Sequence, residues 1–385
     1  MIKTLIAHTT ELDDENLAIE QITSQLKLDG GLLKNTIGIV ACHYEFVLSD
    51  IFKAICGALP FDVVGTISAS QSVQGESGSL LLTLMVLTSD NVEFKKVLTP
   101  SLMTDPTSVI AESYRSACGD KKPALILTYA PFILQNCGDD YVNVLSEVSG
   151  GAPCFGTLAV DDTLDFSNCF MLADGEHYLD KMAMILVYGD LQPKFYVANI
   201  SESRMLDKSA LVTKSAGSVL MEVNERPVID YFSDLGLAKA SEIQYALSSL
   251  PFLLDYNDGT PKVSKIFVTL SPEKYAICAG AMPEGSTLYM AETDKDDVIL
   301  TTGEAADMIV KDASNASVLL IYSCISRSMT LGADQFKEME LIDKKVGGKL
   351  PYMMANSGGE ICPTQISDEM AINRFHNNAF IACLF

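Results

Sequence analysis

The stretch PFDVVGT at residues 60–66 recurs in shortened form as PCFGT at residues 153–157. A glycine precedes each proline, Gly57 in the first copy and Gly150–Gly151 in the second, and glycine commonly ends a helix. An apolar helical pattern comes before each glycine, and a strand pattern continues after each proline. The chain is therefore expected to repeat one unit: helix, strand, helix, strand and a meander of further strands.

A third, weaker copy of this unit is indicated in the C-terminal part of the chain. Thr301 and Glu304 have the spacing of a capping box, and an apolar strand pattern follows at residues 318–324. Gly347–Gly348 and Pro351 then repeat the order of glycine and proline seen in the first two copies. The alternative is that any chain of alternating helices and strands has glycine and proline at such positions.

The 385 residues suggest two domains. Residues 201–212 show little periodicity and are interpreted as a linker, which gives domains at residues 1–200 and 213–385. We expect the α+β class, with each domain a mixed β-sheet covered by helices and built from pseudo-repeated units.

The amino-acid composition indicates which partners and which cellular location to expect. The chain has 27 Lys and Arg against 50 Asp and Glu, a net charge of −23, and such a surface repels nucleic acid and anionic membranes. We expect no signal peptide, and the longest apolar run is far shorter than a membrane span. Ten cysteines without a C-x-x-C pair indicate reduced thiols and a cytoplasmic protein.

Common catalytic patterns are absent from the sequence. It contains no G-x-G-x-x-G, no Walker A loop, no G-x-S-x-G and no H-E-x-x-H. These absences weaken the case for nucleotide-dependent enzymes, hydrolases and metalloproteases. We expect neither a cofactor nor a metal ion.

The segment SCISRSMTLG at residues 323–332 follows an apolar strand pattern, where open sheets hold ligand-binding groups. Cys324 is placed at the strand end, and Arg327 has the planar guanidinium that binds carboxylates. The alternative for Arg327 is a helix cap or an ion pair with a nearby acid. In the first repeat, Cys42 occupies the equivalent position, and we expect a buried Cys42 beside a surface His43.

Two further segments complete the candidate site. In SGGEI at residues 357–361, Gly358 and Gly359 would expose N–H groups and Glu360 would hold an ammonium group, unless this is only a tight turn. In RFHNNAFIACLF at residues 374–385, His376 and Asn377 offer hydrogen bonds, although His376 would also fit as an ordinary core histidine.

The sharpest prediction is that Arg327, Glu360, His376 and Asn377 converge on one cavity. An opposed Arg327 and Glu360 would hold the two charged ends of a zwitterion, such as an amino acid. The alternative is that these two residues simply pair with each other.

These segments together resemble the FIST family, the F-box and intracellular signal transduction proteins. The S-C-x-x-R strand end, the G-E-I turn and the closing F-H-N resemble its C-terminal domain, and the two P…G-T copies resemble its N-terminal domain. The resemblance implies a sensory module for small ligands, amino acids among them, that acts with a signalling partner protein; no output domain is expected within these residues.

We therefore expect a ligand-binding sensory or regulatory protein that performs no chemistry. Its expected ligand contacts are Cys324, Arg327, Gly358, Gly359, Glu360, His376 and Asn377. The alternative is an enzyme with Cys324 as nucleophile, His376 as base and Glu360 as orienting group. An interaction scaffold is a third class, favoured only by an exposed apolar patch.

Overall fold

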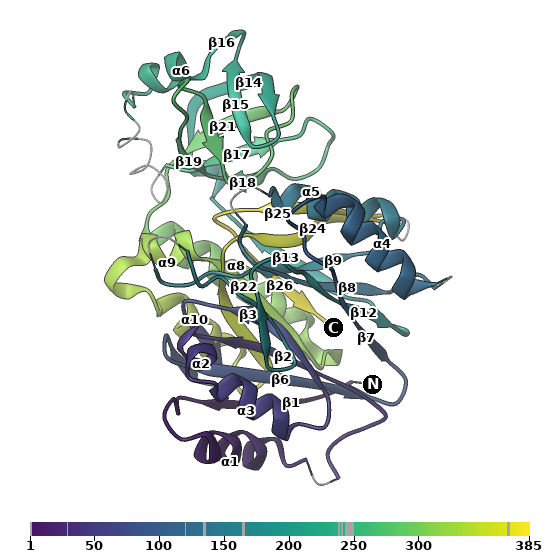
Figure 1. Cartoon of the computed structure of the whole chain (residues 1–385). Helices are drawn as coiled ribbons and strands as arrows, with labels where there is room; N and C mark the ends of the chain where they lie inside the picture. The colour runs from purple at the N-terminus through teal and green to yellow at the C-terminus, as the bar shows by residue number, and fades with distance from the viewer. Residues whose placement is uncertain are drawn as a thin grey trace.

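Three copies of one unit build the body of the molecule, and a further β-sheet stands above them in Figure 1. The computed structural model describes residues 2–28, 30–119, 121–133, 136–163, 166–237, 239, 242, 250–367 and 370–385. No helix in these residues combines the length and the hydropathy that a membrane crossing requires.

The first unit alternates strands and helices and ends in a hairpin and a last strand. Asp14 caps its first helix by accepting from the N–H groups of Asn16 and Leu17. The elements are β1 (Lys3–Thr9), α1 (Glu15–Leu26), β2 (Asn35–Cys42), α2 (Glu45–Leu48), α3 (Ile51–Ala58), β3 (Asp62–Ile67), β4 (Gln71–Val73), β5 (Glu76–Gly78) and β6 (Leu82–Ser89).

The second unit has the same order. Its α4 begins at Pro106 under the cap Asp105, as the sequence predicts. The elements are β7 (Glu93–Leu98), α4 (Pro106–Cys118), β8 (Leu125–Ala130), α5 (Gly138–Val148), β9 (Cys154–Leu158), β10 (Met171–Ala173), β11 (Glu176–Tyr178) and β12 (Ala183–Tyr188).

The third unit begins with β13 and resumes after an insertion. The expected capping box at Thr301 and Glu304 was wrong, because Asp294 caps α8 two turns earlier and Thr301 donates to the carbonyl of Asp297 within the helix. The elements are β13 (Lys194–Ala198), α8 (Lys295–Asp312), β22 (Leu319–Cys324), α9 (Ile325–Leu331), α10 (Lys337–Val346), β23 (Tyr352–Ser357), β24 (Glu360–Ser367), β25 (Met370–His376) and β26 (Phe380–Leu384), with short 3-10 turns at Ala313–Asn315 and Gly332–Asp334.

Each unit gives its hairpin to the sheet of a neighbouring unit. The hairpin β10–β11 extends the first sheet at β3, β24–β25 extends the second at β9, and β4–β5 extends the third at β23. The three six-stranded sheets consequently have matching strand orders. This cyclic exchange confirms the third repeat and ties the units together.

Strand alternation sorts side chains between two kinds of core. On β2, Ile37, Ile39 and Ala41 face a central core shared by all three sheets, while Val40 and Cys42 face α1 and α3. Equivalent outer cores form under α4 and α5 and under α8 and α10. The three sheets thus surround one apolar centre, with helices outside.

The repeated glycine of the P…G-T signature has a steric reason. A Cβ atom at Gly65 would overlap the carbonyl oxygen of Val40, and one at Gly156 would overlap that of Thr128. Both carbonyls belong to the neighbouring parallel strand, so only glycine allows this strand approach.

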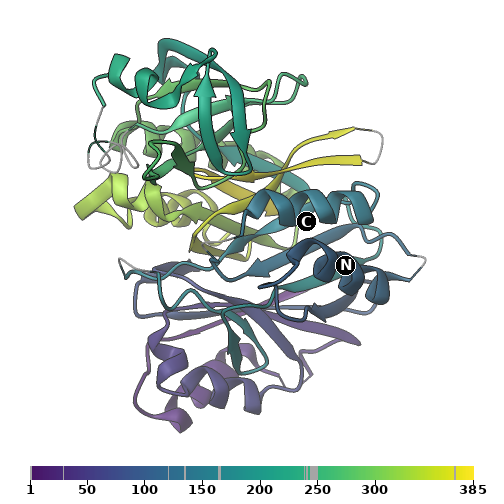
Figure 2. The same ribbon diagram turned by 45° about the horizontal axis from the view of Figure 1, so that its top comes forward.

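A separate antiparallel sheet is inserted between β13 and α8 and lies over the body (Figure 2). The linker expected at residues 201–212 is not seen, because most of it belongs to strand β14 (Met205–Ala216), while the domain boundaries at residues 200 and 213 stay a prediction. The inserted elements are a 3-10 turn (Glu202–Arg204), β14 (Met205–Ala216), β15 (Val219–Val223), β16 (Arg226–Pro227), α6 (Val228–Asp234), β17 (Phe252–Asp255), β18 (Val263–Lys265), β19 (Phe267–Leu270), β20 (Ala276–Cys278) and β21 (Thr287–Ala291).

Candidate functional site

Polar residues gather where the exchanged hairpin β24–β25 crosses from the third unit to the second. Glu360 begins β24 and is paired across the strands with Thr157 on β9 and with His376 on β25. Cys324 and Ser357 end the parallel strands β22 and β23 directly opposite each other. The exchange therefore brings strand ends from two sheets together.

The Glu360 carboxyl group is fully buried at this junction. Its Oε2 accepts from the N–H of Ala379 at 3.3 Å, whereas Oε1 has no hydrogen-bond partner among the described residues. Burial raises the pKa of Glu360 to about 8, although hydrogen bonds from Ser357, Ala379 and Cys324 and the charge of Arg327 act in the opposite direction. At neutral pH this side chain is largely a neutral carboxylic acid.

Cys324 lies beside Glu360 as a neutral thiol. Burial, and secondly the charge of Glu360, raise the pKa of Cys324 to about 12. Its Sγ is 3.2 Å from the Ser326 hydroxyl, which donates to Asn378 Oδ1 at 2.9 Å. Because the thiolate is the nucleophilic form, this environment is unfavourable for covalent catalysis.

His376 ends β25, Asn377 and Asn378 follow in the turn, and all three are buried. His376 Nε2 lies 3.2 Å from the carbonyl of Cys362, and burial lowers the pKa of His376 to about 4, so the ring stays neutral. The backbone N–H of Asn377 donates to the carbonyl of Ser264 in the inserted sheet at 3.0 Å.

Six buried side-chain atoms in these segments have no hydrogen-bond partner in the part of the chain that the structure describes. They are Glu360 Oε1, Arg374 Nε, His376 Nδ1, Asn377 Oδ1, Asn378 Nδ2 and Ser264 Oγ. Buried polar atoms are rarely left in this state, since each costs about 1–3 kcal/mol. We call Ser264, Cys324, Glu360, His376, Asn377 and Asn378 the hairpin site.

Lys265 joins the inserted sheet to the body next to this site. Its Nζ lies 3.0 Å from both carboxylate oxygens of Asp139 and donates to the carbonyl of Phe375 at 2.8 Å. Burial acts to lower the pKa of Lys265, but the charge and hydrogen bond of Asp139, together with Tyr256 and Cys137, outweigh burial and the pKa is raised. The buried pair thus links β18, α5 and β25, which lie together in Figure 1.

Arg327 is directed toward α8 and α10. Its Nε and Nη2 lie 3.0 and 2.9 Å from Glu338 Oε1, and Nη2 also reaches Val298, Thr301 and Thr302. This guanidinium is buried and its contacts hold three helices together. The structure therefore brings Cys324, Glu360, His376 and Asn377 into neighbouring segments, while the charged group of Arg327 is held by Glu338.

Gly358 and Gly359 allow close packing of the turn between β23 and β24. A Cβ at Gly358 would lie 2.6 Å from the carbonyl oxygen of Ala159, and one at Gly359 would overlap the Phe375 ring. Their N–H groups already donate, to the carbonyl of Leu158 and to Ser357 Oγ. These glycines shape the turn from which Glu360 starts.

In the first unit, Cys42 and His43 stand where Cys324 stands in the third unit, and only Cys42 lies as expected. Cys42 is buried as expected, but the surface location of His43 was wrong, since its side chain is only 5% exposed. His43 Nε2 lies 3.2 Å from Asp162, and its ring stacks 4.3 Å from that of Tyr44. The Asp162 carboxylate and the Tyr44 ring account for this burial.

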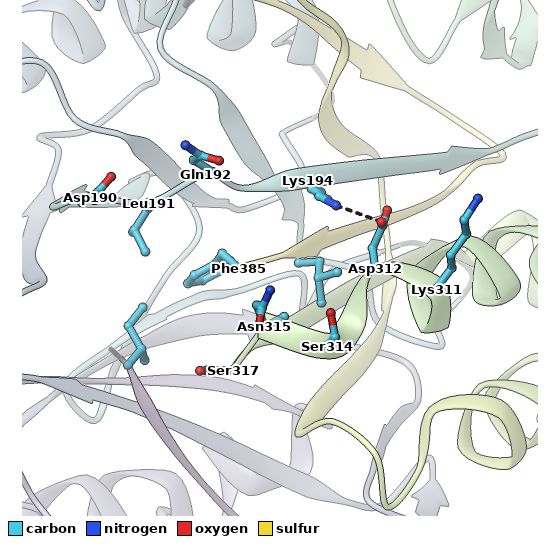
Figure 3. Close-up of a pocket in the computed structure, with 13 residues that line it drawn as sticks. Asp190, Leu191, Gln192, Lys194, Lys311, Asp312, Ser314, Asn315, Ser317 and Phe385 are labelled. Atoms are coloured by element: carbon cyan, nitrogen blue, oxygen red, sulfur yellow. Dashed lines mark ion pairs between the residues drawn. The ribbon is translucent and has the colours of Figure 1, made fainter.

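A cavity of about 350 Å³ adjoins the hairpin site. His376 lines it together with β13, β24 and the inserted sheet; the other lining residues are Phe195, Val197, Asn199, Ile200, Glu202, Leu253, Asp255, Thr260, Pro261, Lys262, Pro363 and Thr364. A larger cavity of about 610 Å³ lies elsewhere, beside the Lys194–Asp312 ion pair and Phe385, and none of the expected site residues lines it (Figure 3).

Some site residues were not identified from sequence. Ser264 and Lys265 lie in the inserted sheet, and no motif marks them in the sequence. Asn378, by contrast, stands in the same H-N-N run as His376 and Asn377, and the sequence already indicates that all three offer hydrogen-bonding groups at the start of the terminal strand. No group of three or more His, Cys, Asp or Glu is arranged for a metal ion within the described ranges.

Comparison with known proteins identifies two family matches. The FIST N domain matches residues 36–226 and the FIST C domain matches residues 228–363. No curated protein sequence matches the chain.

Two solved structures show distant similarity. A cyanuric acid hydrolase from A. caulinodans has 10% identity and a TM-score of 0.38 over 100% of this chain and 99% of its own. PurLQS from Thermotoga maritima has 8% identity and a TM-score of 0.20 over 100% of this chain and 72% of its own. Neither value supports an argument about fold or activity.

Proposed function

Because the chain belongs to the FIST family, we propose that it is a sensory or regulatory protein whose small ligand binds at the hairpin site. FIST domains are generally sensory, ligand-binding domains of signal transduction. The proposed ligand is a small nitrogen-bearing metabolite of amino-acid size. Glu360, His376 and Asn377 are its proposed hydrogen-bonding partners. Cys324 lines the site, and Gly358 and Gly359 shape the turn from which Glu360 starts. Arg327 stabilises the helices next to the site.

The observation that carries this proposal is the set of unpaired buried atoms. Six of them lie in three short segments that are hydrogen-bonded or strand-paired to one another. A bound small molecule with matching donors and acceptors would satisfy them and remove their desolvation cost. The adjoining cavity is within the size range of small-molecule sites.

A thermal-shift screen with amino acids, small carboxylates, amides and amines tests this proposal. A ligand at a hundredfold excess over its dissociation constant should add about 2.7 kcal/mol of stability. Glu360→Gln should weaken that ligand about tenfold, whereas Glu340→Gln on the exposed face of α10 should leave its affinity unchanged. If no compound in the panel raises the melting temperature, the proposal fails.

Ionisation of Glu360 should make stability depend on pH. Its pKa is about 8 when folded against an ordinary value of 4.5, so the folded state holds this proton more tightly. The contribution of protonated Glu360 to the free energy of unfolding is therefore complete below pH 4.5 and is lost as the pH rises toward 8.

Wild type should therefore lose up to about 1.4 kcal/mol per pH unit more than Glu360→Gln between pH 5.5 and 7.5. Urea unfolding at constant ionic strength measures this difference, with Glu340→Gln as the matched control. Parallel profiles for wild type and Glu360→Gln would show that Glu360 ionises normally.

The enzyme alternative predicts a reactive Cys324, and the environment of this thiol predicts the opposite. Under iodoacetamide at pH 7.5, we expect the partly exposed Cys118 to be labelled well before the buried Cys324. Peptide mass spectrometry gives the order of labelling. Selective early labelling of Cys324 would instead favour the nucleophile assignment.

The proposed setting is the cytoplasm, with a signalling partner protein downstream of the ligand. The described cysteines form no disulfide bond with one another, which suits a reducing compartment. The net charge of −23 supports the exclusion of nucleic acid and anionic membranes as partners.

A further inference from the structure

The buried cations around the hairpin site are already neutralised. Arg327 is paired with Glu338, and Lys265 is paired with Asp139, with both carboxylates buried as well. Arg374 on β25, whose Nε is buried without a hydrogen-bond partner among the described residues, pairs with Asp258 through Nη2. A carboxylate entering this region would therefore be desolvated beside cations that each already have a carboxylate partner among the described residues. This arrangement disfavours an acid or the acidic end of a zwitterion.

The side chains that line the cavity carry a net negative charge. Its charged lining residues are Glu202, Asp255 and Lys262, and Lys262 Nζ lies 3.4 Å from Glu202 Oε1. One carboxylate, that of Asp255, is therefore left over, and it would attract a cationic ligand rather than an anionic one.

His376 lines this cavity and carries an unpaired, buried hydrogen-bond acceptor. A carbonyl oxygen can only accept, so the proton of the neutral ring is on Nε2, which faces Cys362. Nδ1 then carries the lone pair, and it has no partner among the described residues. Asn377 Oδ1 is a second unpaired acceptor on the adjacent residue.

Apolar side chains complete the cavity walls. Phe195 and Val197 on β13, Leu253 on β17, and Pro261 and Pro363 surround the space beside His376. Such walls suit the hydrocarbon part of a ligand, while a few polar groups set its orientation.

We propose that the ligand is a small amine with an apolar body, which donates N–H to His376 Nδ1 in the 350 Å³ cavity. This inference rests on the proposed function and narrows its ligand class. The amine nitrogen is held by His376, the cavity holds the hydrocarbon, and a carboxylate group on the same scaffold is rejected.

Matched ligand sets test this inference by titration calorimetry at pH 7. One set is phenethylamine, phenylalanine and 3-phenylpropionate; the other is isopentylamine, leucine and 4-methylpentanoate. Each amine should bind at least tenfold more tightly than its amino acid and its acid, the range expected for one charged hydrogen bond.

Variants of the cavity assign this preference to His376. His376→Leu should remove the preference, and His376→Gln, which keeps an acceptor, should retain part of it. Glu340→Gln is the control, because this residue is exposed on α10 and does not line the cavity. Val197→Phe places a larger side chain in the cavity from β13 and should abolish binding even if the His376 variants do not fold.

The outcomes separate this inference from the proposed function. Binding of an acid or an amino acid as tightly as its amine would overturn the amine assignment and leave ligand sensing intact. Amine binding that survives both His376→Leu and Val197→Phe would move the ligand to another place on the molecule. No binding by any compound would contradict both.

Discussion

Arg327→Ala is expected to lower the free energy of unfolding by about 3–5 kcal/mol, because it leaves the Glu338 carboxylate buried without its cation. Thr301, Thr302 and the carbonyl of Val298 would lose a donor in the same step. Urea unfolding monitored by circular dichroism measures the loss.

Two further variants separate the charge pair from a general effect of arginine removal. Arg226→Ala breaks an exposed pair with Asp234 and should cost less than about 1 kcal/mol. Arg327→Met combined with Glu338→Leu should recover part of the loss, since a buried apolar pair needs no compensation. A cost for Arg327→Ala equal to that of Arg226→Ala would mean that the pair does not stabilise the fold.

Lys265→Ala should have an effect of similar size at the junction between the inserted sheet and the body. It leaves Asp139 buried with only the N–H of Ala281, 2.7 Å away, and the weakly donating Cys137 thiol as donors. We expect a loss of about 3–5 kcal/mol in stability. The inserted sheet should also become more susceptible to limited proteolysis, because its buried contact with α5 and β25 is lost.

Lys262→Ala is the matched control for this second prediction. Lys262 lies three residues earlier, is partly exposed, and faces Glu202 at 3.4 Å. Its removal should change stability by less than about 1 kcal/mol and leave the cleavage pattern unaltered. Equal protease sensitivity of wild type and Lys265→Ala would show that the inserted sheet is held by other contacts.

The repeat was predictable because the glycines and prolines that mark it lie close together in the sequence. Gly150 and Gly347 follow the ends of α5 and α10, whereas Gly57 is the penultimate residue of α3. Gly65 and Gly156 are required by the close approach of a parallel neighbour. The exchange of hairpins was not predictable, since β4 and β5 are three residues long and carry too little pattern to indicate a partner. Their pairing is decided by tertiary packing.

The inserted sheet was missed for a related reason. Strand β14 contains Asp207, Lys208 and Lys214 among its apolar residues, so its sequence reads as a polar linker. In the structure the charged residues lie on the outer, solvent-facing positions, while Ala210 and Val212 are buried. A one-sided strand of this kind is hard to distinguish from a linker by composition alone.

The candidate site was predictable in part. Strand ends with polar residues correctly indicated that Glu360 and His376 would be neighbours, and the register pairs them directly. The partner of Arg327 was not predictable, because Glu338 reaches it through the packing of α10 against α8 and α9. Helix–helix contacts of this kind leave no local signature in the sequence.

A crystal structure of the protein with the most strongly stabilising compound tests whether the ligand binds at the hairpin site. We expect density for that compound in the hairpin site or its adjoining cavity, within hydrogen-bonding distance of His376 Nδ1 and at least one of Glu360 Oε1 and Asn377 Oδ1. Density for the compound in the 610 Å³ cavity beside Lys194 and Asp312, with the hairpin site unchanged, would contradict it.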